Sequence, residues 1–597
     1  MYCKRFSLAI LCAVWLALPA VAHVGDHPSI HNVMASVVDR LRDNLDPEEL
    51  RKIEVDTVME HITEDELHVL GTEYVSFTVD KPVTVYVLRH EGQREEPFWL
   101  SARGFEKTEL EIQTNKRAFV AWKKSFPAGR IGLGVSGFRP HAYPYFAILK
   151  PEDGGDLEVS DIYPGQHRAI TAKSESFVYS DELELRIDTL PDVLAGQTLI
   201  TGIEDRVEDT QLVNIFRNTD YPAGVQPDQI VLTWAGNPKD TQTVQWRTST
   251  EVEDGYVQYQ SQSVPANRIR QVKARRHEIE DAFLANDPLN HRYTATLHGL
   301  KPGVTYRYRV GSRERDTWSD WAAFTTAPRD TEPFSFVYMG DAQNGLDTWG
   351  TLVNKAFDEH PEAAFYVMAG DLVNKGNDRD DWDSFFANAA GIYDRRQLLP
   401  AIGNHECQGD EGPWMYLSIF DLPENGPVDI PEERAYAVSY SNALFLVLDS
   451  NMPAHRQTDW IEEQLSNTDA TWKFVVYHHP AYSSGPSRNN PLIRRYWGEL
   501  FEKYHVDLAL QGHDHAYLRT YPMRDEERVD SPAEGTIYIV SVAGTKMYDQ
   551  GDFDYTEVGF TNVSTYQVLD ITIDGDKLVY KAYDNEGAIR DEFVIEK

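Results

Sequence analysis

The chain has 597 residues, which is more than one hydrophobic core usually organises, so we expect roughly two to four domains. Its 57 Lys and Arg residues against 95 Asp and Glu residues give a formal net charge of −38, which repels nucleic acids and anionic membranes. We therefore expect no nucleic-acid-binding surface. The charge fits solubility or a saline habitat, and a site for a phosphate compound would need local positive charge, most simply from metal ions.

Residues 1–22 have the pattern of a signal peptide. Lys4 and Arg5 precede an apolar run that ends in Ala20-Val21-Ala22, which fits cleavage by signal peptidase. The run is too short to favour a membrane anchor, and no later stretch approaches about 18 uninterrupted apolar residues. We therefore expect an exported protein, secreted or periplasmic, with no membrane span.

The three cysteines predict a mature chain without an intramolecular disulfide. Cys3 and Cys12 lie inside the predicted signal peptide, which leaves Cys407 alone. No catalytic-cysteine pattern surrounds Cys407. We interpret it as a small packed residue rather than a reactive thiol.

Residues 23–60 form a predicted short helical or linker segment. From Met34 to His61 the apolar residues follow helical spacing, as in Val37, Val38, Leu41 and Leu45, and they predict one short helical segment. Three histidines precede or begin this segment, at His23, His27 and His31. They could bind a metal ion, but histidines in such a loose segment are more simply interpreted as solvated.

Residues 61–210 predict a β-sandwich of unknown role. Apolar residues alternate with polar ones on both sides of a Lys81-Pro82 turn, at Val75, Phe77, Val79, Val83, Val85 and Val87. No catalytic constellation lies in this region. Trp99 or Tyr143 could belong to a surface that binds a glycan or a protein partner, although core packing is the simpler interpretation.

Residues 225–328 contain short alternating strands that predict an immunoglobulin-like sandwich. The segment from Tyr293 to Tyr306 contains a Leu-Lys-Pro-Gly turn between two strand-like runs. It resembles the late strand, the turn and the tyrosine-containing strand of fibronectin type III domains. Similar domains precede the catalytic domain of purple acid phosphatases. This likeness concerns the fold and assigns no function by itself.

Residues 329–597 change to a strand, loop and helix order that predicts an α/β domain. Five short apolar runs are each followed at once by polar residues. These motifs are Gly340-Asp341-Ala-Gln343, Gly370-Asp371-Leu-Val-Asn374, Gly403-Asn404-His405-Glu406, His478-His479-Pro480 and Gly512-His513-Asp-His515. Because open α/β sheets bind ligands at the carboxyl ends of their strands, we expect these motifs to meet there.

The residue types in these motifs suit a pair of metal ions. Carboxylate and imidazole ligands bind divalent or trivalent transition metals, and one carboxylate can bridge two ions about 3.5–4 Å apart. Two such ions lower the pKa of a shared water and screen phosphate oxygens. Each motif alone has a simpler interpretation, such as a helix N-cap for an Asp after a strand. The ordered set of five indicates a dinuclear centre.

The order and spacing of the five motifs resemble those of calcineurin-like metallophosphoesterases. The segment Gly512-His-Asp-His-Ala-Tyr-Leu-Arg519 is similar to the closing GHxHxYxR motif of purple acid phosphatases. The resemblance covers about Pro227 to the C-terminus and implies a four-layer αββα catalytic domain after the fibronectin-like domain. Together with the β-sandwich predicted for residues 61–210, the expected fold is two N-terminal β-sandwich domains followed by this α/β domain. It implies that the first metal is bound by Asp341 and His515, that Asp371 bridges, and that the second is bound by Asn404, His478 and His513.

The same resemblance assigns three further residues. His405 would face the substrate and either stabilise the transition state or protonate the leaving alkoxide, which suits an imidazole near neutral pH. His479 would contact the phosphate. Arg519 would orient the closing motif by hydrogen bonding or serve the structure alone.

Two positions depart from the family pattern. Purple acid phosphatases place a tyrosine ligand three residues after the bridging aspartate, where this chain has Asn374. Many other metallophosphoesterases have a histidine where this chain has Gln343. Either amide could bind a metal ion through oxygen or hydrogen-bond a bound water. Without tyrosinate we expect no purple colour, and a divalent pair of manganese, zinc or ferrous iron rather than ferric iron.

The resulting hypothesis is an exported dinuclear-metal phosphatase that hydrolyses phosphate monoesters through hydroxide shared by the two ions. The substrate would be a small-molecule or macromolecular phosphate ester. Two alternatives stay open: a phosphodiesterase or nucleotidase of the same fold, and a surface protein that binds a glycan or a protein partner and has a secondary phosphoesterase domain. The sequence does not indicate the oligomeric state.

Overall fold

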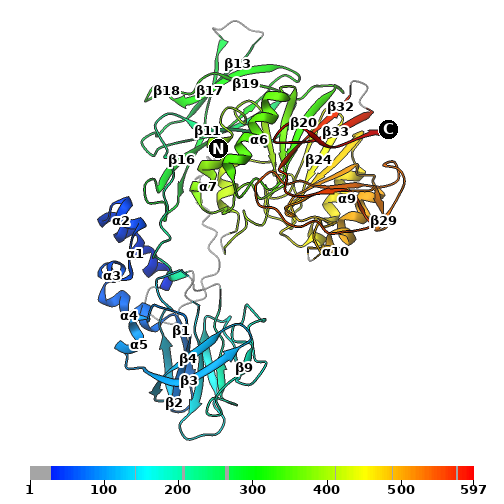
Figure 1. Ribbon diagram of the computed structural model, residues 1–597. Coiled ribbons are helices and arrows are strands. Elements are labelled where there is room, and N and C mark those ends of the chain that lie inside the picture. Colours follow the sequence, from blue (N-terminus) through cyan, green and yellow to red (C-terminus); the bar gives the residue numbers. More distant parts are fainter. Residues whose placement is uncertain are drawn as a thin grey trace, which may run out of the picture. The chain divides into compact units, whose positions relative to one another are not determined.

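The computed structural model describes residues 29–140, 143–204, 209–262, 268–409, 412–486, 488–572 and 576–597. The predicted signal peptide and the candidate ligands His23 and His27 lie outside these residues. The chain divides into two compact units, Met1–Phe216 and Arg217–Lys597 (Figure 1). Each unit is described by itself.

Unit 1 begins with four helices where the sequence predicted one short helical segment. They are α1 (Ile30–Asn44), α2 (Pro47–Arg51), α3 (Val55–Glu60) and α4 (Glu64–Thr72). The side chains of Ser29, Asp46 and Thr63 accept backbone N–H groups at the starts of α1, α2 and α4, so the chain restarts as separate capped helices. The helices continue to Thr72, beyond residue 60. His31 is exposed on α1.

The rest of unit 1 is antiparallel β-structure. One sheet has the order β5-β1-β7 and the other the order β8-β10-β6-β2-β4-β3-β9. The elements are β1 (Val75–Val79), β2 (Val83–His90), α5 (Phe98–Ala102), β3 (Glu106–Thr114), β4 (Ala118–Phe126), β5 (Gly129–Leu133), β6 (Phe146–Pro151), β7 (Val159–Tyr163), β8 (Ala169–Thr171), β9 (Ile187–Thr189) and β10 (Thr198–Ile200). Trp99 is buried and donates to Val135 O at 2.8 Å, so it belongs to the core. Tyr143 is half-buried beneath the Arg117 guanidinium.

Unit 2 opens with a sandwich of two antiparallel sheets. The first has the order β11-β12-β16-β15, and the second the order β14-β13-β17-β18 with β19 also paired to β17. The strands are β11 (Asp228–Thr233), β12 (Thr241–Thr248), β13 (Tyr256–Ser261), β14 (Arg270–Lys273), β15 (Arg275–Glu280), β16 (Leu289–His298), β17 (Thr305–Ser312), β18 (Thr317–Trp318) and β19 (Ala322–Thr325). Their alternating apolar residues meet in a core that includes stacked Trp246 and Tyr293.

The second part of unit 2 contains two larger sheets. One has the order β22-β21-β20-β32-β33-β34 and the other the order β23-β24-β25-β26-β30-β27-β31. The strands of the first are β20 (Phe334–Met339), β21 (Ala363–Met368), β22 (Gln397–Pro400), β32 (Thr565–Ile571), β33 (Lys577–Asp584) and β34 (Ile589–Glu596). Those of the second are β23 (Tyr436–Tyr440), β24 (Ala443–Val447), β25 (Trp472–Val476), β26 (Leu508–Gln511), β27 (Tyr517–Thr520), β30 (Ile537–Val540) and β31 (Thr556–Phe560). Strands β20, β21 and β22 run parallel, as do β24, β25, β26 and β30.

The two sheets pack face to face and helices cover their outer faces. Phe336 and Phe365 of the first sheet contact Phe445 of the second, with ring centroids 5.1 and 5.3 Å from it. Outside the first sheet lie α6 (Leu346–Glu359) and α7 (Arg379–Asn388), and outside the second lie α9 (Thr458–Ser466) and α11 (Glu499–Lys503) (Figure 1). Short elements complete the domain: α8 (Trp414–Ile419), η3 (Ala454–Arg456), α10 (Pro491–Ile493), η4 (Arg494–Gly498), β28 (Met523–Arg524) and β29 (Glu527–Arg528). The predicted αββα domain after sheet-rich N-terminal domains is confirmed.

The sandwich of unit 2 packs directly on the αββα domain. The Trp234 ring lies 5.4 Å from the Phe365 ring, centroid to centroid, and buried Arg247 of β12 forms an ion pair with buried Asp383 of α7 at 2.5 Å. The two parts therefore share both apolar and charged contacts.

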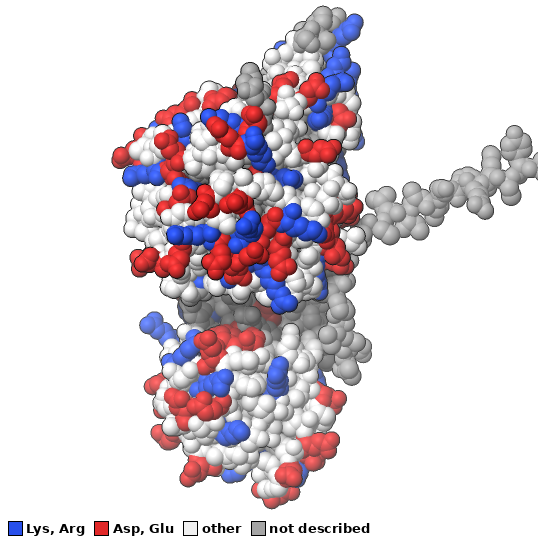
Figure 2. Space-filling model, turned by 90° about the vertical axis from the view of Figure 1, so that its right-hand side faces the viewer, with Lys and Arg blue, Asp and Glu red and all other residues white. Residues whose placement is uncertain are grey.

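Figure 2 shows acidic and basic side chains interspersed over one face of the molecule. Such interspersed charge keeps a surface hydrated. Among the described residues, no helix combines the length and the apolar character that a bilayer crossing requires.

Candidate metal centre

Five loops of the αββα domain carry the predicted ligands to one place. Asp341, Asp371 and Asn404 follow the parallel strands β20, β21 and β22 of one sheet. His478 follows β25 of the other sheet, and His513 and His515 follow its neighbour β26. Because all five strands end at the same edge of the two sheets, their next residues converge.

The backbone at these ligands is unusual. Asp341, Asp371 and His513 have φ values of 47°, 51° and 70°, in the left-handed region that costs a non-glycine residue on the order of 1 kcal/mol. A glycine lies directly before each of them and before Asn404, and at these glycines a side chain would collide with a neighbouring ligand loop. A Cβ on Gly403 would lie 2.1 Å from Asp371 Oδ1, and one on Gly512 would lie 2.4 Å from Asp341 Oδ2. The recurring glycines thus allow the ligand loops to approach closely.

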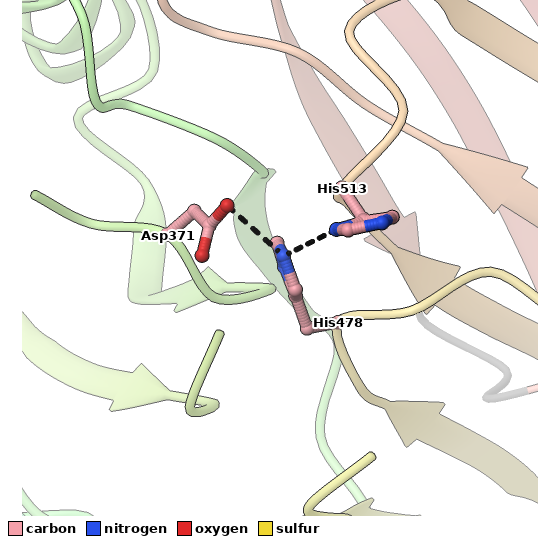
Figure 3. A group of neighbouring side chains, drawn as sticks. All are labelled: Asp371, His478 and His513. Carbon is pink, nitrogen blue, oxygen red and sulfur yellow. Dashed lines mark hydrogen bonds and ion pairs between the residues drawn. The ribbon is translucent and has the colours of Figure 1, made fainter. Parts of the chain in front are cut away.

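The first group of ligand atoms comes from Asp371, His478 and His513, which point toward one another (Figure 3). His478 Nε2 lies 3.0 Å from Asp371 Oδ2 and 3.2 Å from His513 Nδ1. Asn404 Oδ1 lies 3.1 Å from His478 Nε2 and 2.8 Å from His513 Nδ1. All four predicted side chains therefore offer an oxygen or nitrogen to one small volume.

The second group comes from Asp341, Asp371 and His515, whose ligand atoms lie within 4.8 Å of one another. His515 Nε2 is 3.7 Å from Asp341 Oδ1. The His515 ring is oriented by a 2.9 Å hydrogen bond between Nδ1 and Lys546 O, which leaves Nε2 directed at the carboxylates. Asp371 belongs to both groups, so the structure brings together the two ligand sets that the resemblance implied and makes Asp371 common to them.

The residues fit metal ions by their donors and by their unsatisfied atoms. Asp341 Oδ1 and Gln343 Oε1 are buried and have no hydrogen-bond partner among the described residues. Such atoms are costly unless something else satisfies them. Carboxylate oxygens, imidazole nitrogens and one amide oxygen form a donor set for transition metals. The fold implies a dinuclear metal site, and the two groups sharing Asp371 could hold it.

The electrostatics of the cluster suit cation binding. Burial raises the pKa of Asp341 well above its usual range, and the charge of Asp371 adds to this. Burial lowers the pKa of His478, but the charges of Asp371 and Asp341, together with hydrogen bonds to Asp371 and to the backbone of Ala369, outweigh burial and raise it to about 9. Burial lowers the pKa of His515 to about 4 and that of His513 further. His513 and His515 are thus neutral near pH 7, the state in which imidazole binds metal.

His405 lies beside the first group but is not part of it. Its backbone N–H donates to Asp371 Oδ1 at 2.9 Å, and its Nε2 lies 3.9 Å from Asp371 Oδ2. Its Nδ1 hydrogen-bonds the backbone oxygen of Asn374, so Nδ1 donates and Nε2 is free to exchange a proton. The side chain is 18% exposed, which lets a substrate reach it.

His479 also borders the cluster. Its ring centroid lies 4.4 Å from that of His513, and its Nδ1 hydrogen-bonds Ser450 Oγ at 2.9 Å. Burial and the charge of His478 lower its pKa to about 3, so it is neutral over most of the pH range. A neutral imidazole here can hydrogen-bond a phosphate but adds no charge.

Arg519 has its charge satisfied away from the ligands. Its Nε donates to Asp591 Oδ2 at 2.6 Å, and its Nη1 forms an ion pair with Glu557. These contacts join β27 to β34 and β31. They give Arg519 a structural role, which was one of the two alternatives.

The two amide positions differ in their environment. Gln343 is buried between the ligand groups, with Nε2 3.0 Å from Asp371 Oδ2 and 3.2 Å from His515 Nε2. Rotation of the terminal amide by half a turn would present the Gln343 oxygen to the same place. Asn374 is half-buried and uses its backbone oxygen to hold His405. Gln343 is thus the better placed of the two for a metal ion.

Glu406 has a role that the sequence did not indicate. This buried carboxylate accepts hydrogen bonds from the backbone N–H groups of Asp371, Leu372, Val373 and Gly403 at 2.7–3.3 Å. It therefore joins the Asp371 loop to the Asn404 loop. Burial and the charge of Asp371 raise its pKa to about 7. Its place directly after His405 was visible, but spacing does not reveal bonds to backbone groups.

The neighbouring Cys407 is packed against the core of the domain, and Arg434 Nη2 approaches its Sγ at 3.6 Å. Burial raises the pKa of its thiol to about 12. Since the thiolate is the reactive form, this supports the interpretation of Cys407 as a packed residue.

Comparison with family models identifies two domains. Residues 227–326 match the model described as "Purple acid Phosphatase, N-terminal domain", and residues 334–517 match "Calcineurin-like phosphoesterase". The first coincides with the unit 2 sandwich and the second with the αββα domain as far as β27.

Curated relatives and a solved structure agree with these matches. The Fe(3+)-Zn(2+) purple acid phosphatase 12 of Arabidopsis thaliana is 23% identical over 50% of this chain and 66% of its own length. The probable inactive purple acid phosphatase 27 of the same plant is 24% identical over 51% of this chain and 57% of its own. This chain spans about half the length of the first curated relatives it matches.

A purple acid phosphatase from yellow lupin (Lupinus luteus) seeds has a similar fold, with a TM-score of 0.56 and 16% identity over 88% of this chain and 93% of that one. At this identity the likeness concerns the fold alone. The domain matches, the likeness in fold and the ligand groups together show that this chain carries a calcineurin-like phosphoesterase domain preceded by a purple acid phosphatase N-terminal domain.

Proposed function

We propose that the chain is a metal-dependent phosphatase that hydrolyses phosphate monoesters at the carboxyl edge of its two large sheets. The observation that carries the proposal is the pair of ligand groups that share Asp371. Asp341 and His515 would hold one ion, and Asn404, His478 and His513 the other. When bound, the two ions would supply an activated water and would neutralise phosphate oxygens.

The residues of the chain supply the rest of the chemistry. Glu406 fixes the Asp371 and Asn404 loops through backbone hydrogen bonds, which limits reorganisation during the reaction. The hydrogen bond from His405 Nδ1–H to Asn374 O fixes the ring with Nε2 as its open position, and when Nε2 is also protonated it can donate that proton to the departing alkoxide. His479, held by Ser450, can hydrogen-bond a phosphate oxygen.

The metal pair is proposed to be divalent, of manganese, zinc or ferrous iron. Asn374 stands where purple acid phosphatases have tyrosine, and a neutral amide supports ferric iron less than a phenolate does. A divalent pair leaves its water with a higher pKa, so we expect activity at neutral or alkaline pH and no purple colour. An optimum near about pH 5 with bound ferric iron would refute this assignment.

Some relatives are named inactive, and this chain differs from a degenerate enzyme in its site. All six ligand residues are present and brought together. Export of the chain, to the periplasm or outside the cell, is proposed from the signal-like residues 1–22. A glycan or protein ligand for the sandwich of unit 1 also stays a proposal.

Asn374 favours a second candidate, a phosphodiesterase or nucleotidase, because this departure moves the chain toward the wider superfamily. The deciding experiment measures hydrolysis of para-nitrophenyl phosphate and of bis-para-nitrophenyl phosphate by protein reconstituted with manganese, zinc or ferrous iron. A higher kcat/KM for the monoester supports the first candidate, and a higher value for the diester supports the second. Activity that is unchanged in Asp371→Asn would sink both.

A further inference from the structure

Arg488 is fixed beside the candidate metal centre by its neighbours in the fold. Its Nε donates to Asp514 Oδ1 at 2.6 Å, and its Nη2 donates to His513 O at 3.0 Å. His513 and the residue after Asp514, His515, belong to the two ligand groups. Arg488 therefore lies directly against the segment that supplies a ligand to each group.

The buried partner Asp514 explains why this arginine is held in one position. Asp514 is 0% exposed, and its Oδ2 also accepts from the backbone N–H and the hydroxyl of Ser484, the former at 2.6 Å. One carboxylate thus joins the loop before Arg488 to the loop that carries His513. A guanidinium bound in this way has lost most of its rotamer freedom before any ligand arrives.

The bonding pattern leaves one edge of the guanidinium available. Nε and Nη2 form the edge that faces Asp514 and His513, and no hydrogen bond engages Nη1 within the described residues. The remaining edge, with Nη1 and the second hydrogen of Nη2, is a two-donor fork whose spacing matches two oxygens of a carboxylate or phosphate. The Arg488 side chain is 28% exposed, so this edge can meet a solute.

The Tyr548 ring lies close to both the Arg488 guanidinium and the ring of His515, a candidate metal ligand. The Arg488 guanidinium carbon lies 5.1 Å from the centroid of the Tyr548 ring, and that ring lies 4.7 Å from the ring of His515. Lys546, which is exposed, places Nζ 5.3 Å from the same ring. Two cations therefore flank one aromatic ring that packs on a candidate metal ligand.

The wider surroundings are acidic. Asp549 and Asp552 are exposed on the segment that follows Tyr548, and the whole chain carries a net charge of −38. A second anionic group on a substrate would be repelled here unless it met a cation at short range. Arg488 and Lys546 supply such cations next to the site.

From this geometry we propose that Arg488, assisted by Lys546, is an anion subsite that selects phosphate esters whose leaving group carries a second anionic group, a carboxylate or a further phosphate. The inference rests on the proposed function and adds a substrate class to it. The reacting phosphate would lie at the two ligand groups, and the second anion at the free edge of Arg488.

The test compares two esters that differ only in the second anion, phenyl phosphate and 3-carboxyphenyl phosphate. The quantity measured is the ratio of their kcat/KM values for metal-loaded protein at one ionic strength. We expect the wild-type ratio to favour the carboxylated ester about ten-fold or more, and Arg488→Gln to bring the ratio near one. Arg488→Lys keeps the charge but not the fork, so it should restore only part of the ratio.

The matched control is Arg456→Gln, which changes an exposed arginine of η3 and should leave the ratio at its wild-type value. Metal content measured on each variant separates a lost subsite from a disturbed ligand segment. A wild-type ratio near one, or a ratio unchanged by Arg488→Gln, would overturn the inference. If the protein hydrolyses neither ester, the proposed function is refuted. The inference about Arg488 is then decided by the dissociation constants of the two esters, measured by calorimetry: a wild-type ratio near one, or a ratio unchanged by Arg488→Gln, would overturn it.

Discussion

Unit 2 contains two buried clusters of acidic residues, and they are built differently. Between the sandwich and the αββα domain, Asp383 is 1% exposed in its side chain and lies 2.5 Å from Arg247, while Asp287 forms an ion pair with Arg379. At the carboxyl edge of the sheets, Asp341 and Asp371 are equally buried, yet among the described residues their ion-pair partners are histidines alone.

The difference shows where the chain supplies its own cations and where it does not. Guanidinium groups are permanently charged and hold the first cluster together as part of the structure. Imidazoles can be neutral: burial keeps His513 and His515 so, and only His478, whose pKa is raised to about 9, places a positive charge beside the two carboxylates. The first cluster is therefore complete without a ligand, whereas the second calls for bound metal.

The largest effect is expected from Asp371→Asn. This change removes the one carboxylate common to both ligand groups, so phosphatase activity should fall at least about a thousand-fold. The measurement is kcat/KM for para-nitrophenyl phosphate in metal-reconstituted protein. Asp383→Asn, in the other cluster, is the matched control and should retain activity in the folded fraction. Equal loss in the two variants would erase the distinction between the clusters.

The next effect concerns His405. His405→Gln keeps the backbone N–H that donates to Asp371 Oδ1 but removes the proton-exchanging Nε2. We expect kcat to fall about 100- to 1,000-fold with metal content unchanged. The measurement is kcat for para-nitrophenyl phosphate, with metal content determined on the same sample. A variant that loses metal together with activity would place His405 among the ligands.

A third test addresses the arginine cluster, in which Arg247 and Arg379 form ion pairs with Asp383 and Asp287. Arg247→Met removes the nearer of the two arginines that pair with buried Asp383, at 2.5 Å against 3.6 Å for Arg379, and should lower the free energy of unfolding by up to about 3–5 kcal/mol. The double variant Arg247→Met with Asp383→Leu removes both charges and should regain much of that loss. Urea unfolding measures both values. Metal stoichiometry should stay at the wild-type value throughout, and a change in it would show that the two clusters are coupled.

The smallest effect is a pH dependence at the edge of the arginine cluster. Burial raises the pKa of Asp378 from 3.8 to about 6, against the opposing charges of Arg217 and Lys375. The Asp378 carboxyl therefore binds its proton more tightly in the folded state than in the unfolded state. Its stabilising contribution to folding is fully present below the pKa of the unfolded state and is lost as the pH rises through the pKa of the folded state. The free energy of unfolding should fall by about 2 kcal/mol more in wild type than in Asp378→Asn between about pH 4 and pH 7. Parallel profiles for the two proteins would contradict this.

The sequence predicted the centre well because its signal is local. Each ligand directly follows a short apolar strand, and the ends of parallel strands must meet, so Asp341, Asp371 and His478 could be brought together from one-dimensional spacing. The alternation of apolar residues likewise predicted the antiparallel β-strands of both units. Capping by Asp46 and Thr63 divided the predicted single helical segment, because hydrogen bonds of single side chains decide where short helices restart.

The roles of the residues around the ligands depend on contacts between loops, and the spacing of apolar residues in the sequence does not predict such contacts. Glu406 works through backbone N–H groups of another loop, and Arg488 reaches Asp514 across 26 positions. Arg519 matched a family motif, but its partners Asp591 and Glu557 come from strands late in the chain. Pairings of this kind follow from the three-dimensional packing of the two sheets and their loops.

The central claim is that the Asp371 cluster holds two metal ions per chain. The most direct measurement is elemental analysis of the purified full chain after reconstitution and removal of unbound metal, with Asp371→Asn measured in parallel. We predict two ions per chain in wild type and fewer than two in the variant. A wild-type chain that retains no metal, or an Asp371→Asn variant that still binds two ions, would contradict the claim.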